Sequence, residues 1–353
     1  MRLIFLFCLF LYFFILSIQL LGVSFKLFGK GFADNLIRTT SSPFTGLFIG
    51  ILATSLTQSS STTTSIVVGL VASGVLSLHN AIPIVMGANI GTTITSIIVS
   101  LGHINRKLEF QRAFAASLVH DNFNLLSVMI LFPLNLWTNY LERMSTYVSG
   151  LVKSSGGMTF GSPLKMVTAP VASAIAELFH NNGLITLIFA MFFLFLSLRY
   201  MVVYMKALIM DRAGTAFDQI FFKTPYHALF FGMMLTALIQ SSSVTTSLMI
   251  PLAGAGLITL EKLAPYTMGT NVGTTITAFL AAFATGNPVA VSVAVAHLFF
   301  NVSGLALFWW VRWIPIKTAE WIARLTTINR IYAVIYVLLL FFLIPLSLVF
   351  FMN

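Results

Sequence analysis

Two matching polar sequences lie within otherwise apolar parts of this chain. One consists of Gln58, Ser59, Ser60, Ser61, Thr62, Thr63 and Thr64; the other, 182 residues later, contains Gln240, Ser241, Ser242, Ser243, Thr245 and Thr246. An unsatisfied polar group costs several kcal/mol in hydrocarbon, so these side chains must face protein or a water-filled cavity. Ser and Thr also compete for backbone hydrogen bonds, which favours a break in the helix at each sequence.

A helix broken at these positions offers binding groups for ions. The second half-helix is expected to begin near Ser60, where free backbone N–H groups and the positive dipole end suit phosphate or carboxylate. Backbone carbonyls at the end of the first half-helix, together with the hydroxyls, suit a hard cation such as sodium. The alternative is packing, because Ser, Thr and Gly are common between transmembrane helices. Two matched clusters, each headed by Gln, favour a binding site.

A second repeated motif, Gly-x-Asn-x-Gly-Thr-Thr, follows each polar sequence. Its glycines allow close backbone approach or local unwinding, and its Asn supplies both a donor and an acceptor. We favour a role in lining the site over the alternative, a tight helix crossing with a buried Asn that joins the helices. The motif's candidate site residues are Asn89, Thr92 and Thr93 in the first copy and Asn271, Thr274 and Thr275 in the second.

Three further polar residues fall within an apparent spanning helix. His120 and Asn124 are four residues apart, as are His297 and Asn301 in the second copy, so each pair shares a helix face and is expected to bond to neighbouring helices. Asp121 has no acidic counterpart in the second copy, and carboxylates inside membranes are costly and usually functional. Asp121 is expected either to hold a coupling cation or proton, or to pair with a neighbouring polar group.

The composition indicates a membrane protein. Of 353 residues, 58% are hydrophobic and 8% are charged, too few to cover a water-soluble domain. The net charge of +10 is spread thinly between apolar segments, so we interpret it as topology-setting and exclude nucleic-acid binding. The single cysteine, Cys8, excludes an internal disulfide framework and a cysteine-based metal cluster. No constellation for catalysis is present, so neither an enzyme nor a cofactor is expected.

We predict an all-α polytopic membrane protein built from two repeats, each with a re-entrant helical hairpin broken at Gln-Ser-Ser-Ser. Apolar segments long enough to span a bilayer lie at about 3–25, 82–101, 111–133, 183–208, 262–285, 288–313 and 329–351. The expected units are a first repeat at 1–133 with its hairpin at about 43–76, a polar external linker at 134–182, a second repeat at 183–313 with its hairpin at about 225–258, and a C-terminal transmembrane helix at 314–353.

The number of crossings sets the symmetry of the repeats. With a re-entrant hairpin each unit crosses three times, and an odd number inverts the second copy relative to the first. The resulting topology places about 13 Lys and Arg on the side of the N-terminus and about six on the other side. The positive-inside rule therefore supports hairpins, a cytoplasmic N-terminus and an external linker. If the polar segment spans once instead, the repeats are parallel.

Both motifs together resemble the type II sodium/phosphate cotransporter family and its bacterial members over about 40–133 and 183–313. The resemblance implies that Gln58–Thr64 and Gln240–Thr246 form the sodium and phosphate sites, with Asn89 and Asn271 close by. Sodium, the coupling ion, is expected at Gln58, Ser61, Gln240 and Ser243. The implied location is the bacterial inner (plasma) membrane.

The resemblance implies sodium-coupled phosphate uptake, while phosphate export by the same scaffold and a passive anion channel remain alternatives. Many bacterial members carry a PhoU-like helical domain after the membrane part. Because no such domain precedes the end of this sequence at Asn353, regulation of that kind is expected to require a separate PhoU-like partner.

Overall fold

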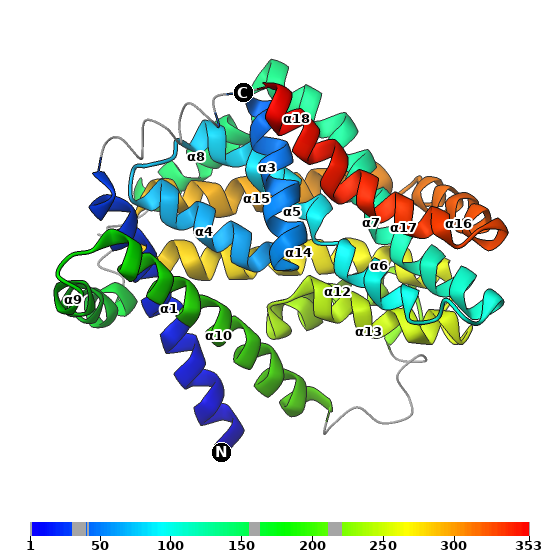
Figure 1. The fold of residues 1–353 in the computed structure, drawn as a ribbon, viewed down its shortest axis with the longest axis horizontal. Helices are drawn as coiled ribbons and strands as arrows, with labels where there is room; N and C mark the ends of the chain where they lie inside the picture. The colour runs from blue at the N-terminus through cyan, green and yellow to red at the C-terminus, as the bar shows by residue number, and fades with distance from the viewer. Residues whose placement is uncertain (1, 30–39, 41, 155–162, 211–220, 353) are drawn as a thin grey trace.

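The computed structural model describes residues 2–29, 40, 42–154, 163–210 and 221–352, and these are helical with short turns (Figure 1). Parts of three expected loops, at 30–39, 155–162 and 211–220, lie outside the described residues. The first half comprises α1 (Arg2–Leu27), α3 (Pro43–Thr57), α4 (Ser60–Ala72), α5 (Leu78–Gly91), α6 (Ile94–Leu101), α7 (Lys107–Thr138), α8 (Tyr140–Ser154) and α9 (Pro163–Leu178). The second half comprises α10 (Gly183–Met210), α12 (Pro225–Ile239), α13 (Ser242–Gly254), α14 (Leu260–Thr285), α15 (Pro288–Phe308) and α16 (Trp313–Ile328), and the chain ends with α17 (Ile331–Leu338), a π-helical turn (Leu339–Leu343) and α18 (Ile344–Met352).

Among these helices, six spans have the length and composition needed to cross a membrane, which confirms the all-α polytopic class. They are Arg2–Leu27, Leu78–Leu101, Lys107–Thr138, Gly183–Tyr200, Pro288–Phe308 and Ile331–Met352. Seven were expected, and the missing one is α14, whose 26 residues include many Thr and an Asn. Those polar side chains are buried inside the protein, so α14 is less apolar than the other spans although it lies in the core.

Two segments contain more helix than the sequence predicted. The expected linker at 134–182 contains α8 and α9; α8 packs against α15, and α9 packs against α1. The segment at 314–353 contains α16, which packs against α7, before the C-terminal span begins at Ile331. Because α8 follows α7 and packs on α15, while α16 follows α15 and packs on α7, these helices make matching contacts in the two halves.

The break within the segment at 82–101 was also not expected. Here α5 ends at Gly91 and α6 begins at Ile94, with Thr92 and Thr93 in a turn between them. The equivalent α14 runs without interruption through Thr274 and Thr275. The two copies of the Gly-x-Asn-x-Gly-Thr-Thr motif therefore differ in backbone structure despite their similar sequences.

Glycines bring two pairs of helices into backbone contact. A Cβ added to Gly87 on α5 would lie 1.9 Å from the main-chain oxygen of Leu47 on α3. A Cβ added to Gly269 on α14 would lie 2.0 Å from the main-chain oxygen of Leu229 on α12. Such separations are far below van der Waals contact, so only glycine permits these crossings. The tight crossing that the sequence left as an alternative for this motif is therefore present in both halves.

We predict that Gly87→Ala and Gly269→Ala each destabilise the folded protein. A methyl group at either position must push two backbones apart, and overpacking of this kind costs about 1–3 kcal/mol or more. The measurement is the thermal midpoint of detergent-purified protein. Gly22→Ala in α1 is the matched control, because an added Cβ there meets nothing within 4 Å. Wild-type midpoints in both motif variants would contradict the close-contact interpretation.

Candidate functional site

Each Gln-Ser-Ser-Ser sequence lies at the break between two helices, and we call these two breaks the tips of the expected hairpins. The arm α3 ends at Thr57, Gln58 adopts a left-handed conformation with φ 52°, and Ser59 caps α4 by accepting a hydrogen bond from the Thr62 backbone N–H at 3.2 Å. A left-handed residue ends a helix, and for a residue other than Gly it costs about 1–3 kcal/mol, a strain that is typical of functional sites.

The second tip repeats this geometry. The arm α12 ends at Ile239, Gln240 has φ 60°, and Ser241 caps α13 by accepting from the Val244 N–H at 3.3 Å. Both second arms therefore begin with uncommitted backbone N–H groups at the N-terminal end of a helix dipole, where anions bind favourably.

A pair of threonines joins the two arms of each hairpin. Thr54 Oγ1 donates to Thr63 Oγ1 at 2.9 Å, and Thr236 Oγ1 and Thr245 Oγ1 lie 2.8 Å apart at the equivalent place. Thr54 and Thr236 were not among the predicted site residues. Their signal was available in the sequence, because each stands four residues before the Gln of its own copy.

The two tips meet directly. Ser61 Oγ donates to the main-chain oxygen of Gln240 at 2.9 Å, which joins residues 179 positions apart. Ser243 Oγ lies 3.3 Å from the main-chain oxygen of Thr92, and Thr92 Oγ1 donates to Ser60 Oγ at 3.0 Å. The structure thus brings both polar sequences together with Thr92 from the turn between α5 and α6.

The remaining hydroxyls bond within their own elements. Thr62 Oγ1 donates to Ser59 Oγ, Thr246 Oγ1 donates to the oxygen of Ser242, Thr274 Oγ1 donates to the oxygen of Thr270, and Thr275 Oγ1 donates to the oxygen of Val272. Thr274 and Thr275 therefore use their hydroxyls along α14 itself. The buried Thr64 Oγ1 and Gln240 Oε1 have no hydrogen-bond partner within the described part of the chain.

The two glutamines differ in exposure. Gln240 is buried, with 7% of its surface exposed, whereas the equivalent Gln58 is exposed. Identical sequences in a symmetric arrangement would be equally accessible. The pair of tips is therefore asymmetric, with Gln58 exposed at the protein surface and Gln240 enclosed.

Asn271 lies in a buried network between the halves rather than at the tips. His120 Nε2 on α7 lies 2.7 Å from Asn271 Oδ1 on α14, and Asn271 Nδ2 donates to Asn124 Oδ1 at 2.5 Å. Asn124 Nδ2 in turn donates to the main-chain oxygen of Asn89 at 2.7 Å.

Asn89, in the first half, makes the equivalent set of hydrogen bonds with α15 of the second half. His297 Nε2 on α15 lies 3.1 Å from Asn89 Oδ1, and Asn89 Nδ2 donates to Asn301 Oδ1 at 2.5 Å. Asn301 Nδ2 donates to the main-chain oxygen of Asn271 at 2.9 Å. The side-chain carbonyl and the side-chain amide of Asn89 and Asn271 thus both form hydrogen bonds between helices. The His–Asn pairs were expected to make such bonds. Ligand binding by Asn89 and Asn271 stays a prediction.

Asp121 is fully buried on α7 and pairs with neighbouring hydroxyls. Thr93 Oγ1 donates to Asp121 Oδ1 at 2.5 Å, and the hydroxyl of Tyr336 on α17 donates to Asp121 Oδ2. Neither donor carries a positive charge, so these bonds orient the carboxylate without neutralising it. Nothing in the repeat pattern indicated Tyr336, because this residue lies outside the duplicated part of the chain.

Comparisons with known proteins match this architecture to one family. Residues 13–161 and 192–312 match the family described as Na+/Pi-cotransporter. Sodium-dependent phosphate transport protein 2B of Pongo abelii is 33% identical over 96% of this chain and 63% of its own length, and protein 2A of Ovis aries is 34% identical over 95% and 65%. This chain belongs to the Na+/Pi-cotransporter family.

That result confirms the resemblance to the type II family, whose matching relatives are named sodium-dependent phosphate transport proteins. Sodium-dependent phosphate transport protein 2B of Homo sapiens is likewise similar, with 32% identity over 96% of this chain and 63% of its own length. The chain spans just under two thirds of the length of these relatives. No solved structure matches it.

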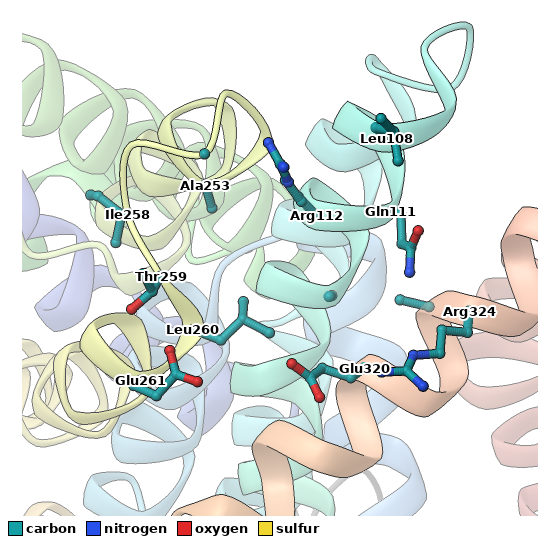
Figure 2. A pocket seen from close by; sticks show the side chains of 13 residues that line it. Leu108, Gln111, Arg112, Ala253, Ile258, Thr259, Leu260, Glu261, Glu320 and Arg324 are labelled. Atoms are coloured by element: carbon teal, nitrogen blue, oxygen red, sulfur yellow. The ribbon is translucent and has the colours of Figure 1, made fainter.

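A surface pocket of about 460 Å³ is lined by residues that belong to neither the Gln-Ser-Ser-Ser sequences nor the Gly-x-Asn-x-Gly-Thr-Thr motifs. It lies between the start of α7, the turn before α14, and α16 (Figure 2). Arg112 reaches from α7 toward that turn, and Glu320 and Arg324 lie on α16 (Figure 2). The pocket is lined by charges of both signs, which does not suit selective binding of an anion.

We predict that Asn271→Ala destabilises this family member by about 2 kcal/mol, because it leaves the buried His120 Nε2 and Asn124 Oδ1 without their partners. The free energy of unfolding of purified protein in detergent tests this. Asn80→Ala, at the start of α5 and outside the network, is the control. Equal stability of the two variants would show that the network does not hold the halves together.

Proposed function

We propose that this chain is a sodium-coupled symporter for inorganic phosphate, working in uptake, with its site where the two hairpin tips meet. The observation that carries the proposal is the direct contact of the tips, in which Ser61 reaches the main-chain oxygen of Gln240. Two helix N-termini for an anion and two helix C-terminal ends for a cation then lie together, the arrangement by which broken helices bind substrate and coupling ions in secondary transporters.

The ligand roles follow from the atoms at the tips. We assign phosphate to the N-terminal turns of α4 and α13, with hydroxyls from Ser60, Ser61, Ser242 and Ser243. We assign sodium to oxygens of Gln58, Gln240 and the neighbouring Ser61 and Ser243. The unpartnered Gln240 Oε1 supports this assignment, because a buried acceptor without a donor is costly and would gain a partner from a bound cation.

Asp121 is the proposed coupling group. Its buried carboxylate accepts a hydrogen bond from Thr93. The preceding residue in the chain, Thr92, forms hydrogen bonds with both tips. A buried charge is expensive unless it is paired, so the site favours a bound cation.

We further propose that the halves are inverted in a plasma membrane, with a cytoplasmic N-terminus. The span Leu78–Leu101 and α14 carry equivalent motifs, so we assign α14 a crossing although its composition is more polar. Each half then crosses three times and carries one re-entrant hairpin, consistent with the excess of Lys and Arg on the side of the N-terminus.

Phosphate flux into proteoliposomes tests the coupling. We expect uptake of labelled phosphate when sodium is higher outside, and little uptake when potassium replaces it. Uptake that ignores sodium would refute symport and favour a passive channel. Phosphate efflux as the dominant direction under an inward sodium gradient would favour export.

We predict that Gln58→Ala and Gln240→Ala each reduce sodium-driven phosphate uptake at least about tenfold, because each removes an oxygen from the proposed sodium site. Folding should be retained, since neither side chain anchors a helix contact. Gln111→Ala at the start of α7, away from the tips, should transport as the wild type does. Wild-type uptake in both tip variants, measured at equal protein amounts, would mean that these glutamines only shape the hairpins.

A further inference from the structure

Tyr336 lies beyond residues 192–312, where the second family match ends, yet its hydroxyl donates to the buried carboxylate of Asp121. The C-terminal span that carries it is mostly exposed, with few of its side chains buried, among them Ala333, Val337 and Phe341. Its hydrogen bond to a buried carboxylate of α7 is therefore one of few inward contacts made by a helix whose side chains are mostly exposed.

Packing fixes the position of the Tyr336 hydroxyl. The ring lies edge-on to Phe114 on α7, with ring centroids 6.4 Å apart, and Phe114 stands two helical turns before Asp121. The ring contact does not depend on the hydroxyl. Replacing Tyr by Phe should therefore keep the helix in place and remove only the hydrogen bond.

The two oxygens of Asp121 are held from different elements. Thr93, in the turn between α5 and α6, donates to one oxygen, and Tyr336 donates to the other. Donors to both oxygens stabilise the charged form of a carboxylate and fix its rotamer. The remaining lone pairs are thus held in one orientation, beside the turn whose Thr92 bonds to both hairpin tips.

The C-terminal helix also reaches the first hairpin. Beyond Tyr336, the π-helical turn Leu339–Leu343 and α18 both pack against α3, the first arm of that hairpin. In Figure 1 this red segment lies along the side of the molecule that carries α3 and α7. One helix therefore contacts both the carboxylate and the arm that ends at Gln58.

We propose that Tyr336 is a positioning residue for Asp121, which it holds charged and oriented to bind the coupling sodium ion. The inference rests on the proposed function, and it adds a residue outside the duplicated halves to the transport machinery. Tyr336 does not itself bind sodium or phosphate in this proposal. Its effect should appear in the dependence of transport on sodium, rather than in the affinity for phosphate or the maximal rate.

The test is sodium-activated phosphate uptake by Tyr336→Phe in proteoliposomes. We expect the half-saturating sodium concentration to rise about tenfold, equivalent to about 1.4 kcal/mol, because the variant lacks one charge-assisted hydrogen bond. The half-saturating phosphate concentration at saturating sodium, and the maximal rate, should stay within about twofold. The matched control is Tyr332→Phe, one turn earlier on the same helix and 47% exposed.

A double variant separates positioning from general stability. If Tyr336 acts through the carboxylate, adding Tyr336→Phe to Asp121→Asn should change sodium dependence no further than Asp121→Asn alone. Unchanged sodium activation in Tyr336→Phe, or a loss of maximal rate without a shift in sodium activation, would overturn the positioning role. Wild-type uptake that is independent of sodium would instead refute the proposed function, and the positioning role with it.

Discussion

The structure depends on one constraint: polar groups inside an apolar protein must find partners within it. The chain satisfies this with reciprocal bonds between its halves. Asn271 takes its partners from α7 of the first half, and Asn89 takes its partners from α15 of the second. Because neither Asn can be satisfied by its own half, these hydrogen bonds specify how the halves fit together as well as contributing to stability.

The same constraint explains how a backbone break is tolerated at each hairpin tip. Helix ends leave N–H and carbonyl groups without partners, and such ends can lie inside a membrane only against protein or a water-filled cavity. Capping by Ser59 and Ser241 and the contact between Ser61 and Gln240 satisfy some of these groups. Backbone contacts at Gly87 and Gly269 hold α5 and α14 against the first arms of the hairpins, so each break has a rigid support.

Duplication and asymmetry coexist in this chain. The threonine bridges, glycine contacts and Asn networks occur twice with nearly equal geometry. The halves differ at the turn containing Thr92 and Thr93, at Asp121, and in the exposure of Gln58 and Gln240. The first two differences adjoin each other, because Thr93 bonds to Asp121. A feature present in only one half can give that half a separate task, such as binding a coupling ion.

The sequence by itself determined the membrane class, the duplication, the helix breaks at the two Gln-Ser-Ser-Ser sequences and the family, because these follow from local polarity and from identities between the copies. It also identified Asn89 and Asn271 as important, but only the tertiary structure decided that their side chains join helices. The tertiary structure likewise supplied α8 and α16 as packing helices and Tyr336 as the partner of Asp121. Contacts between residues hundreds of positions apart leave no local pattern, and a single Tyr on an apolar, mostly exposed helix carries no sequence signal that sets it apart.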